Sequence, residues 1–152
     1  MSRSFFVQAV ALFITLVVAG SAHAGWDVTA SSRVGFVSIK NNSIGENNVF
    51  EHVTGSISDA GQVALSIDLT SVETGVGIRN ERLQRMLFEV EKFPTATVQA
   101  TLSASQLEAL NAGGSVSETV KVTVSLHGMS VDKSAALSVG VSEDGLRVTS
   151  TQ

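Results

Sequence analysis

Two histidines are the side chains in the body of this sequence that could act as a general base or a metal ligand near neutral pH. They are His52, which follows Glu51, and His127, which precedes Gly128. Neither belongs to a metalloprotease, nucleophile-elbow or phosphate-loop motif, and no spacing with carboxylates demands a metal. A structural or exposed role is therefore favoured for both, and the sequence predicts no catalytic residue, no metal site and no cofactor.

A hydrolase or isomerase that uses His52 or His127 stays open as a third hypothesis. It requires a carboxylate or hydroxyl within hydrogen-bond reach of one imidazole, in a cleft that admits a substrate.

Arginines form the one basic cluster of the sequence. Arg79, Arg82 and Arg85 follow one another at helical spacing, and Lys92 comes shortly after. One interpretation is a cationic rim that meets an anionic or polar head group. The favoured one is a solvated helix face paired with Glu81, because exposed ion pairs need no functional explanation. Arg79 stands apart, since it precedes the predicted helix and could turn toward an opening.

Composition excludes several classes of protein. The chain has 152 residues, enough for one domain with a sizeable core. Its formal net charge of −4 argues against nucleic acid as a partner. It has no cysteine, which excludes disulfides, thiol nucleophiles and zinc–thiolate sites.

The first residues have the layout of a secretory signal peptide. Arg3 supplies a positive start, residues 5–19 are apolar, and Ala22-His23-Ala24 has the small-x-small pattern of a cleavage site. The apolar run is shorter than the roughly 20 residues that a spanning helix needs. We expect cleavage after Ala24, a mature domain of residues 25–152, secretion to a bacterial periplasm, and no stable membrane span after processing.

Most of the remaining sequence is typical of strands. Apolar and polar residues alternate over 62–72, 120–126 and 135–141, which predicts strands with one buried face. Residues 34–39, 49–57 and 95–102 read as further strands, and Glu143-Asp144-Gly145 predicts a hairpin into a last strand at 146–151. The sequence therefore predicts about seven strands.

Two segments have helical signals. Leu83, Met86, Leu87 and Val90 fall on one helical face, with Asn80 as the expected N-cap and Pro94 ending the segment. A shorter helical turn is expected at 103–110, where Ser103 and Gln106 fit a capping box.

These elements indicate a mainly β, antiparallel sandwich or barrel with one inserted amphipathic helix. A barrel of about eight strands is wide enough to hold one small ligand. We expect the helix to cover an open end of such a barrel with Leu83, Met86 and Leu87.

Several motifs of the mature chain resemble those of the YceI-like family, secreted bacterial proteins with a lipocalin-like barrel that bind polyisoprenoid lipids. The matching positions are Trp26, Ser32-Arg33-Val34-Gly35-Phe36, Ser71-Val72-Glu73-Thr74, Arg79-Asn80 with Leu83, Phe88-Glu89-Val90-Glu91-Lys92-Phe93-Pro94, and Leu126-His127-Gly128-Met129. The run from Ser71 to Pro94 is the most specific part of the resemblance.

The sequence differs from the family pattern at several positions. Asn80 stands where the family usually has Asp, and Thr29 and Ser31 stand where it often has Asp and His. The family continues past the strand at 146–151 into a final segment that is missing here. We therefore expect an incompletely closed, lipocalin-like barrel whose open sheet edge can pair with a second copy of the chain.

The resemblance implies a non-enzymatic binder or carrier, with a prenyl chain inside the barrel and its head group near the mouth. The expected ligand is an isoprenoid lipid, either a polyprenyl chain or an isoprenoid quinone. Arg79 is the expected head-group contact, and the expected lining is Phe36, Leu65, Ile67, Leu69, Leu83, Met86, Leu87, Val122, Val124, Leu137 and Val139. The alternative is a structural or interaction protein with a solid barrel core that binds a partner through its surface.

Overall fold

The computed structural model describes residues 25–40, 44–142 and 145–150. The predicted signal peptide at 1–24 and the hairpin residues Glu143 and Asp144 lie outside the described residues. The elements in chain order are β1 (Trp26–Asp27), β2 (Val34–Lys40), β3 (Ile44–Phe50), β4 (Val53–Ile57), β5 (Gln62–Asp68), the 3-10 turn η1 (Leu69–Ser71), β6 (Val72–Glu73), α1 (Gly77–Arg82), the π-helical segment η2 (Leu83–Phe88), β7 (Thr95–Thr101), α2 (Ala104–Asn111), β8 (Ser115–Leu126), β9 (Met129–Ser142) and β10 (Gly145–Ser150).

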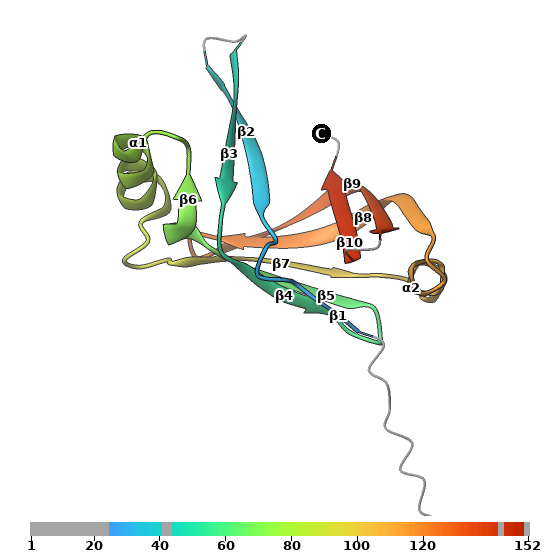
Figure 1. The fold of residues 1–152 in the computed structure, drawn as a ribbon. Helices are drawn as coiled ribbons and strands as arrows, with labels where there is room; N and C mark the ends of the chain where they lie inside the picture. Colours follow the sequence, from blue (N-terminus) through green and yellow to red (C-terminus); the bar gives the residue numbers. More distant parts are fainter. Residues whose placement is uncertain (1–24, 41–43, 143–144, 151–152) are drawn as a thin grey trace, which may run out of the picture.

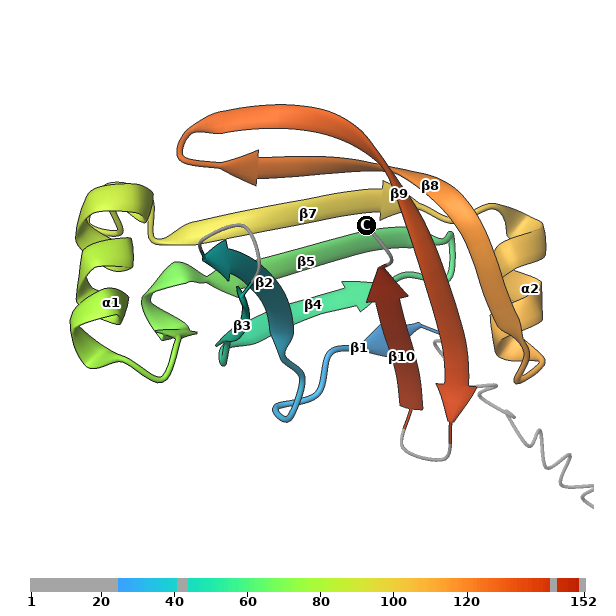
Figure 2. The same cartoon turned by 90° about the horizontal axis from the view of Figure 1, so that it is seen from above.

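Seven strands form one antiparallel sheet in the order β1-β4-β5-β7-β8-β9-β10. This sheet curves into a nearly closed barrel, with α1 near one end of the strands and α2 near the other (Figure 1, Figure 2). Its two edges are β1 and β10. The predicted fold class, a mainly β antiparallel barrel that is incompletely closed, is confirmed. Whether the β10 edge pairs with a second copy stays a prediction.

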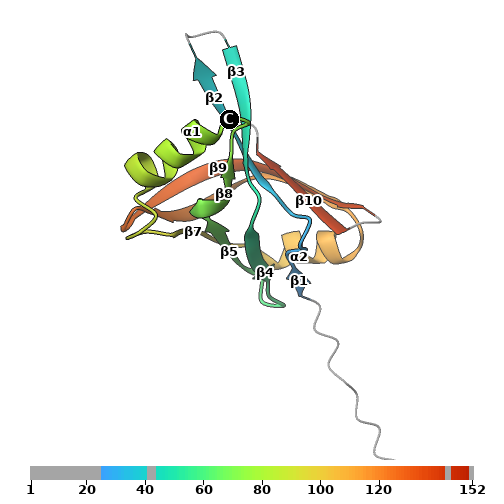
Figure 3. The ribbon, with the colours of Figure 1, turned by 60° about the vertical axis from the view of Figure 1, so that its left-hand side comes forward.

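A second, three-stranded sheet has the order β2-β3-β6. Its β2–β3 hairpin projects away from the large sheet beside α1 (Figure 1, Figure 3). The prediction of one strand over 49–57 is wrong, because the chain leaves the small sheet at Phe50 and enters the large one at Val53. Backbone N–H groups of Glu51 and His52 donate to the carbonyl and the hydroxyl of Ser71 at this break.

Strands β8 and β9 are longer than their alternation predicts. Leu126 pairs with Met129 and Ser115 with Gly140, so the two strands form one long hairpin. Polar residues such as Asp132 and Lys133 interrupt the apolar pattern near the turn, but backbone pairing continues because ladder hydrogen bonds do not depend on side-chain polarity.

Two apolar clusters pack against the inner face of the large sheet, one toward each end. The first, toward α1, is made of Phe50, Val53, Ile67, Leu69, Val72, Phe88 and Ala96. The second, where α2 packs, is made of Leu102, Leu110, Val116 and Val139. Leu110 is among the most buried side chains described. The predicted capping box of α2 is confirmed, since the Ser103 hydroxyl accepts from Gln106 N–H and the Gln106 side chain accepts from Ser103 N–H.

The amphipathic helix differs from the prediction in where it begins and in its number of residues per turn. It begins at Gly77, so Asn80 lies inside α1 and is not the N-cap. From Leu83 the chain is π-helical, which gives more residues per turn than an α-helix and changes which side chains share a face. Phe88 is buried, whereas Met86 and Leu87 are 72% and 60% exposed. The expectation that Met86 and Leu87 join Leu83 over the barrel end is therefore wrong.

Candidate functional site

A row of apolar side chains crosses four neighbouring strands of the large sheet. Leu65 of β5 pairs with Val98 of β7, Val98 pairs with Val124 of β8, and Val124 pairs with Val131 of β9. Directly paired residues share a face of a sheet, and Leu65 and Val98 pack against the first cluster. The row therefore lies on the inner face.

The side chains of this row are less covered by neighbouring side chains than those of the two clusters are. Leu65, Val98 and Val124 are half-buried, and Val131 is 49% exposed. Removing such surface from water is favourable in proportion to its apolar area. The inner row is thus a part of the barrel wall with apolar area still available to a hydrocarbon ligand.

The predicted lining residues take three kinds of position. Leu65, Ile67, Val122, Val124, Leu137 and Val139 lie on the inner face of the large sheet, and three of them, Ile67, Val122 and Val139, are buried. Phe36 and Leu83 pack against the first cluster. Leu69 lies in η1, outside any strand, and is 2% exposed, so it is held in the core. Whether any of these residues contacts a ligand stays a prediction.

The sequence did not single out Val98 and Val131 as part of this face. Val98 could have been found from the alternation of 95–101. Val131 could not, because Asp132 and Lys133 hide its strand from a periodicity count.

Arg79 forms an ion pair with Glu46 on the β2–β3 hairpin. Its Nη1 donates to Glu46 Oε2 at 2.8 Å and its Nη2 to Glu46 Oε1 at 3.3 Å. This two-pronged contact joins α1 to β3, and the sequence did not identify Glu46 as a partner of Arg79. The predicted role of Arg79 at a head group is not tested by this contact.

The motif residues Glu73, Thr74 and Asn80 hydrogen-bond to one another. Asn80 Oδ1 accepts from the N–H and the hydroxyl of Thr74, and Asn80 Nδ2 donates to Glu73. Glu73 also accepts from the N–H of Gly75, and this bond, followed by the one from Asn80, lowers the pKa of Glu73 below its ordinary value. The motif thus fixes the start of α1 against β6.

Both histidines have a carboxylate partner at the surface. His127 Nε2 and Glu89 Oε2 are 2.5 Å apart, and the His127 ring packs on Phe93. Exposed His52 has its Nδ1 3.7 Å from Asp68 Oδ2. The hydroxyl of Thr70 is the main cause that lowers the pKa of Asp68. The third hypothesis therefore has its imidazole–carboxylate pairs, but neither histidine is among the residues that line the two hollows described next.

Two shallow hollows lie on the outer face of the large sheet. The larger, about 530 Å³, is lined by Gln62, Ala64, Gln99, Ala100, Thr101, Lys121, Thr123 and Asp132. Most of these side chains are polar or charged, so this hollow is a poor match for an apolar ligand.

Within the described ranges, no helix has the length and apolar character needed to cross a bilayer. The same residues contain no group of three or more His, Asp or Glu side chains placed to hold a metal ion.

Comparison with known proteins identifies the fold. A family model described as the YceI-like domain matches residues 26–151. The chain belongs to the YceI-like family. A solved polyisoprenoid-binding domain from Saccharophagus degradans is 33% identical to this YceI-like chain, with a TM-score of 0.69, and the match covers 78% of this chain and 68% of that one.

A second solved structure supports the YceI-like fold alone. BcnA of Burkholderia cenocepacia is 16% identical, with a TM-score of 0.54, and the match covers 78% of this chain and 72% of that one. The search of curated proteins found no match. The sequence resemblance to the YceI-like family is thereby confirmed, and the matched segment includes the inner row.

Proposed function

We propose that this YceI-like protein binds an isoprenoid lipid, a polyprenyl chain or an isoprenoid quinone, without chemical conversion. The observation that carries the proposal is the half-buried row from Leu65 to Val131 on the inner face of the barrel. The name of the Saccharophagus degradans domain, which is 33% identical, supports the same ligand class.

The binding energy of such a ligand comes from burial of hydrocarbon. An isoprene unit has five carbons, and at about 0.8 kcal/mol per buried carbon each unit contributes at most about 4 kcal/mol. Ordering the flexible chain offsets part of this gain. A few units buried against the inner row are enough for useful affinity, so the function requires no catalytic side chain.

The predicted signal peptide is the reason that we propose the periplasm as the location of this function. Residues 1–24 lie outside the described structure, so this location rests on the sequence pattern. An intact mass of the exported protein that begins at Gly25 would support it, and an intact mass that still includes Met1 to Ala24 would contradict it.

Neighbouring residues on β9 offer a matched test of the inner face. Val131 and Ser130 are both exposed, and successive residues of a strand point to opposite faces. Val131→Asp puts a charge on the inner row, and Ser130→Asp puts the same charge on the outer face. Titration with a dansyl-labelled geranylgeranyl probe, with native mass spectrometry of the freshly purified protein, measures the effect.

We expect Val131→Asp to weaken probe binding by about tenfold or more, because a carboxylate beside hydrocarbon must be desolvated. Ser130→Asp should bind the probe like the unaltered protein. Equal binding by both variants would remove the inner row as the site, and absence of probe and co-purified lipid from the unaltered protein would remove the proposal.

The second candidate is an interaction protein with a solid barrel core. The packing of Phe50, Ile67 and Phe88 in one cluster and Leu110 and Val139 in the other favours it, since much of the inner face is already covered. It predicts no lipid uptake and unchanged partner binding in Val131→Asp.

A further inference from the structure

A surface beside the barrel combines exposed apolar and exposed basic side chains within twelve residues of chain, the α1–η2 segment at 77–88. Ile78, Met86 and Leu87 are more than half exposed, and Arg82 and Arg85 are exposed between them. Ile78 and Arg82 are four residues apart in α1, which places them on the same side of that helix, and Arg85, Met86 and Leu87 follow in η2. We call these five residues the basic apolar patch.

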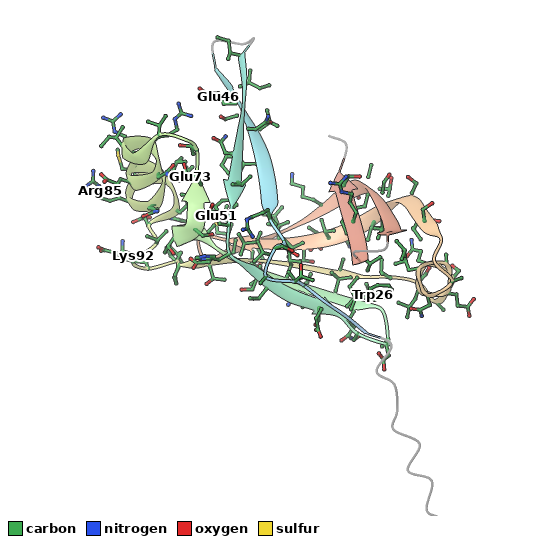
Figure 4. The ribbon with its side chains drawn as sticks, viewed as in Figure 1. Trp26, Glu46, Glu51, Glu73, Arg85 and Lys92 are labelled. Atoms are coloured by element: carbon green, nitrogen blue, oxygen red, sulfur yellow. The ribbon has the colours of Figure 1, made fainter. Side chains whose placement is uncertain are left out.

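The π-helical turn is what creates the apolar part of this patch. A continuous α-helix would place Leu83, Met86 and Leu87 on one face. The wider turn instead directs Phe88 into the first cluster and leaves Met86 and Leu87 exposed. Figure 4 shows Arg85 on the side of this segment that points away from the sheet.

A second element adds apolar surface close to the patch. Ile44 of β3 is more than half exposed and lies on the same face of the hairpin as Glu46, whereas exposed Val37 and Ile39 lie on the opposite face. The Arg79–Glu46 ion pair holds this β2–β3 hairpin to α1, and the two elements project from the large sheet side by side (Figure 1, Figure 3). The exposed side chain of Ile44 thus lies on the face of the hairpin that is joined to α1.

The charge of the segment bears on the kind of partner that it fits. Three arginines stand against the single glutamate Glu81, so residues 77–88 carry a net charge of +2 in a chain whose net charge is −4. Exposed apolar side chains interleaved with arginine are typical of segments that lie on membrane surfaces, where the apolar groups enter the acyl boundary and the cations meet anionic head groups.

A second copy of the chain fits this surface poorly. A two-fold symmetric dimer built on the patch would bring Arg82 and Arg85 of both copies into one interface. Like charges that face each other across an apolar interface are unfavourable. On a negatively charged surface with hydrocarbon beneath it, the arginines of the patch meet opposite charge and its apolar side chains are buried.

We infer that the basic apolar patch docks the protein on an anionic lipid surface. This inference deepens the proposed function, because an isoprenoid ligand that resides in a membrane must be reached there. Docking and ligand binding nevertheless use different residues, the patch for the first and the inner row for the second, so each can fail alone.

Vesicle binding tests the inference. The full chain is expressed, and the exported protein is purified. It is then sedimented with vesicles of pure phosphatidylcholine, or with vesicles of equal parts phosphatidylcholine and phosphatidylglycerol. We expect binding to the anionic vesicles, weaker binding as salt is raised, and little binding to phosphatidylcholine alone.

Two double variants separate the halves of the patch. Arg82→Glu with Arg85→Glu should lose about tenfold or more of the affinity for anionic vesicles. Ile78→Asp with Met86→Asp should lose binding to a similar extent, and these exposed positions tolerate the change without unfolding. Arg33→Glu with Lys121→Glu, exposed residues outside the patch, makes the same charge change and should keep vesicle binding.

Titration of the same variants with the dansyl-labelled probe in vesicle-free solution keeps the two proposals apart. Patch variants that bind the probe normally but lose the vesicles support docking. Unaltered protein that binds vesicles but no probe overturns the proposed function and leaves docking intact. Docking is overturned if the unaltered protein does not bind anionic vesicles, or if the control variant loses as much vesicle affinity as the patch variants. It is also overturned if light scattering shows a dimer that Ile78→Asp dissociates.

Discussion

Glu89 and His127 are the two non-glycine residues with positive φ in the described part of the chain, and their side chains hydrogen-bond to each other. Glu89, at φ 48°, ends η2, and His127, at φ 54°, opens the two-residue turn between β8 and β9. Left-handed backbone costs on the order of 1 kcal/mol for such residues. One side-chain pair thus ties together two backbone positions that the sequence alone would disfavour.

The Glu89 side chain should make stability depend on acid pH. Lys92 first, and then His127, lower the pKa of Glu89 below its ordinary value of 4.5. A carboxyl whose pKa is lower in the folded state stabilises the fold above its unfolded pKa, and this contribution is lost as the pH falls through the folded value.

Melting temperatures of the unaltered protein and Glu89→Gln check this. The difference between them should be largest near neutral pH and should shrink below about pH 4.5 as Glu89 takes up its proton. Glu91→Gln removes the same charge from an exposed neighbour and should show no such pattern. A Glu89→Gln difference that is constant with pH would contradict the assignment.

The turn at His127-Gly128 should be sensitive to a β-carbon. Gly128 has φ 74°, and a Cβ there would lie 2.9 Å from Cε1 of Phe93. Gly128→Ala should therefore cost about 1–2 kcal/mol from the left-handed backbone alone, plus the crowding of Phe93. Gly140→Ala on β9, where a Cβ meets nothing within 4 Å, should cost little. Urea unfolding of both variants measures the contrast.

Adjacent residues of η2 should differ widely in their contribution to stability. Phe88 is buried against Phe50, at a ring-centroid distance of 5.7 Å, whereas Leu87 is exposed. Phe88→Ala should cost about 3–5 kcal/mol, and Leu87→Ala should stay within about 0.5 kcal/mol. Similar losses for the two in chemical denaturation would show that the segment is α-helical and that Leu87 faces inward.

A charge exchange distinguishes the two roles of Arg79. Arg79→Glu or Glu46→Arg alone breaks the ion pair, and the combination restores it with reversed polarity. If Arg79 serves only to hold α1 to the hairpin, the combined variant should regain stability and keep ligand binding. If Arg79 also contacts an anionic head group, the combined variant should regain stability but bind a prenyl phosphate more weakly than a neutral prenyl chain.

The sequence predicted the regular parts of this protein. Alternation over 62–72 and 135–141 identified strands, because one buried face and one wet face leave a period-two pattern in any sheet. The first of these strands ends at Asp68, and residues 69–71 form the 3-10 turn η1 instead. The Ser103–Gln106 capping box located α2, because capping is satisfied within a few residues of chain. The family motifs identified the YceI-like domain, which the family match confirms.

Other features depend on contacts between residues far apart in the chain. The break at Glu51 and His52 exists because Ser71 supplies their hydrogen-bond partners. Met86 and Leu87 are exposed because Phe88, and not they, packs into the core, where its ring contacts Phe50.

The chain by itself determined which segments are strands, which faces are apolar and which family the domain belongs to, because those properties are written in local patterns. Only the tertiary structure decided that Leu65, Val98, Val124 and Val131 form one row, and that Arg79 meets Glu46. The reason is physical: strand register and helix rotation are set by how all the side chains pack together, and no short stretch of sequence contains that information.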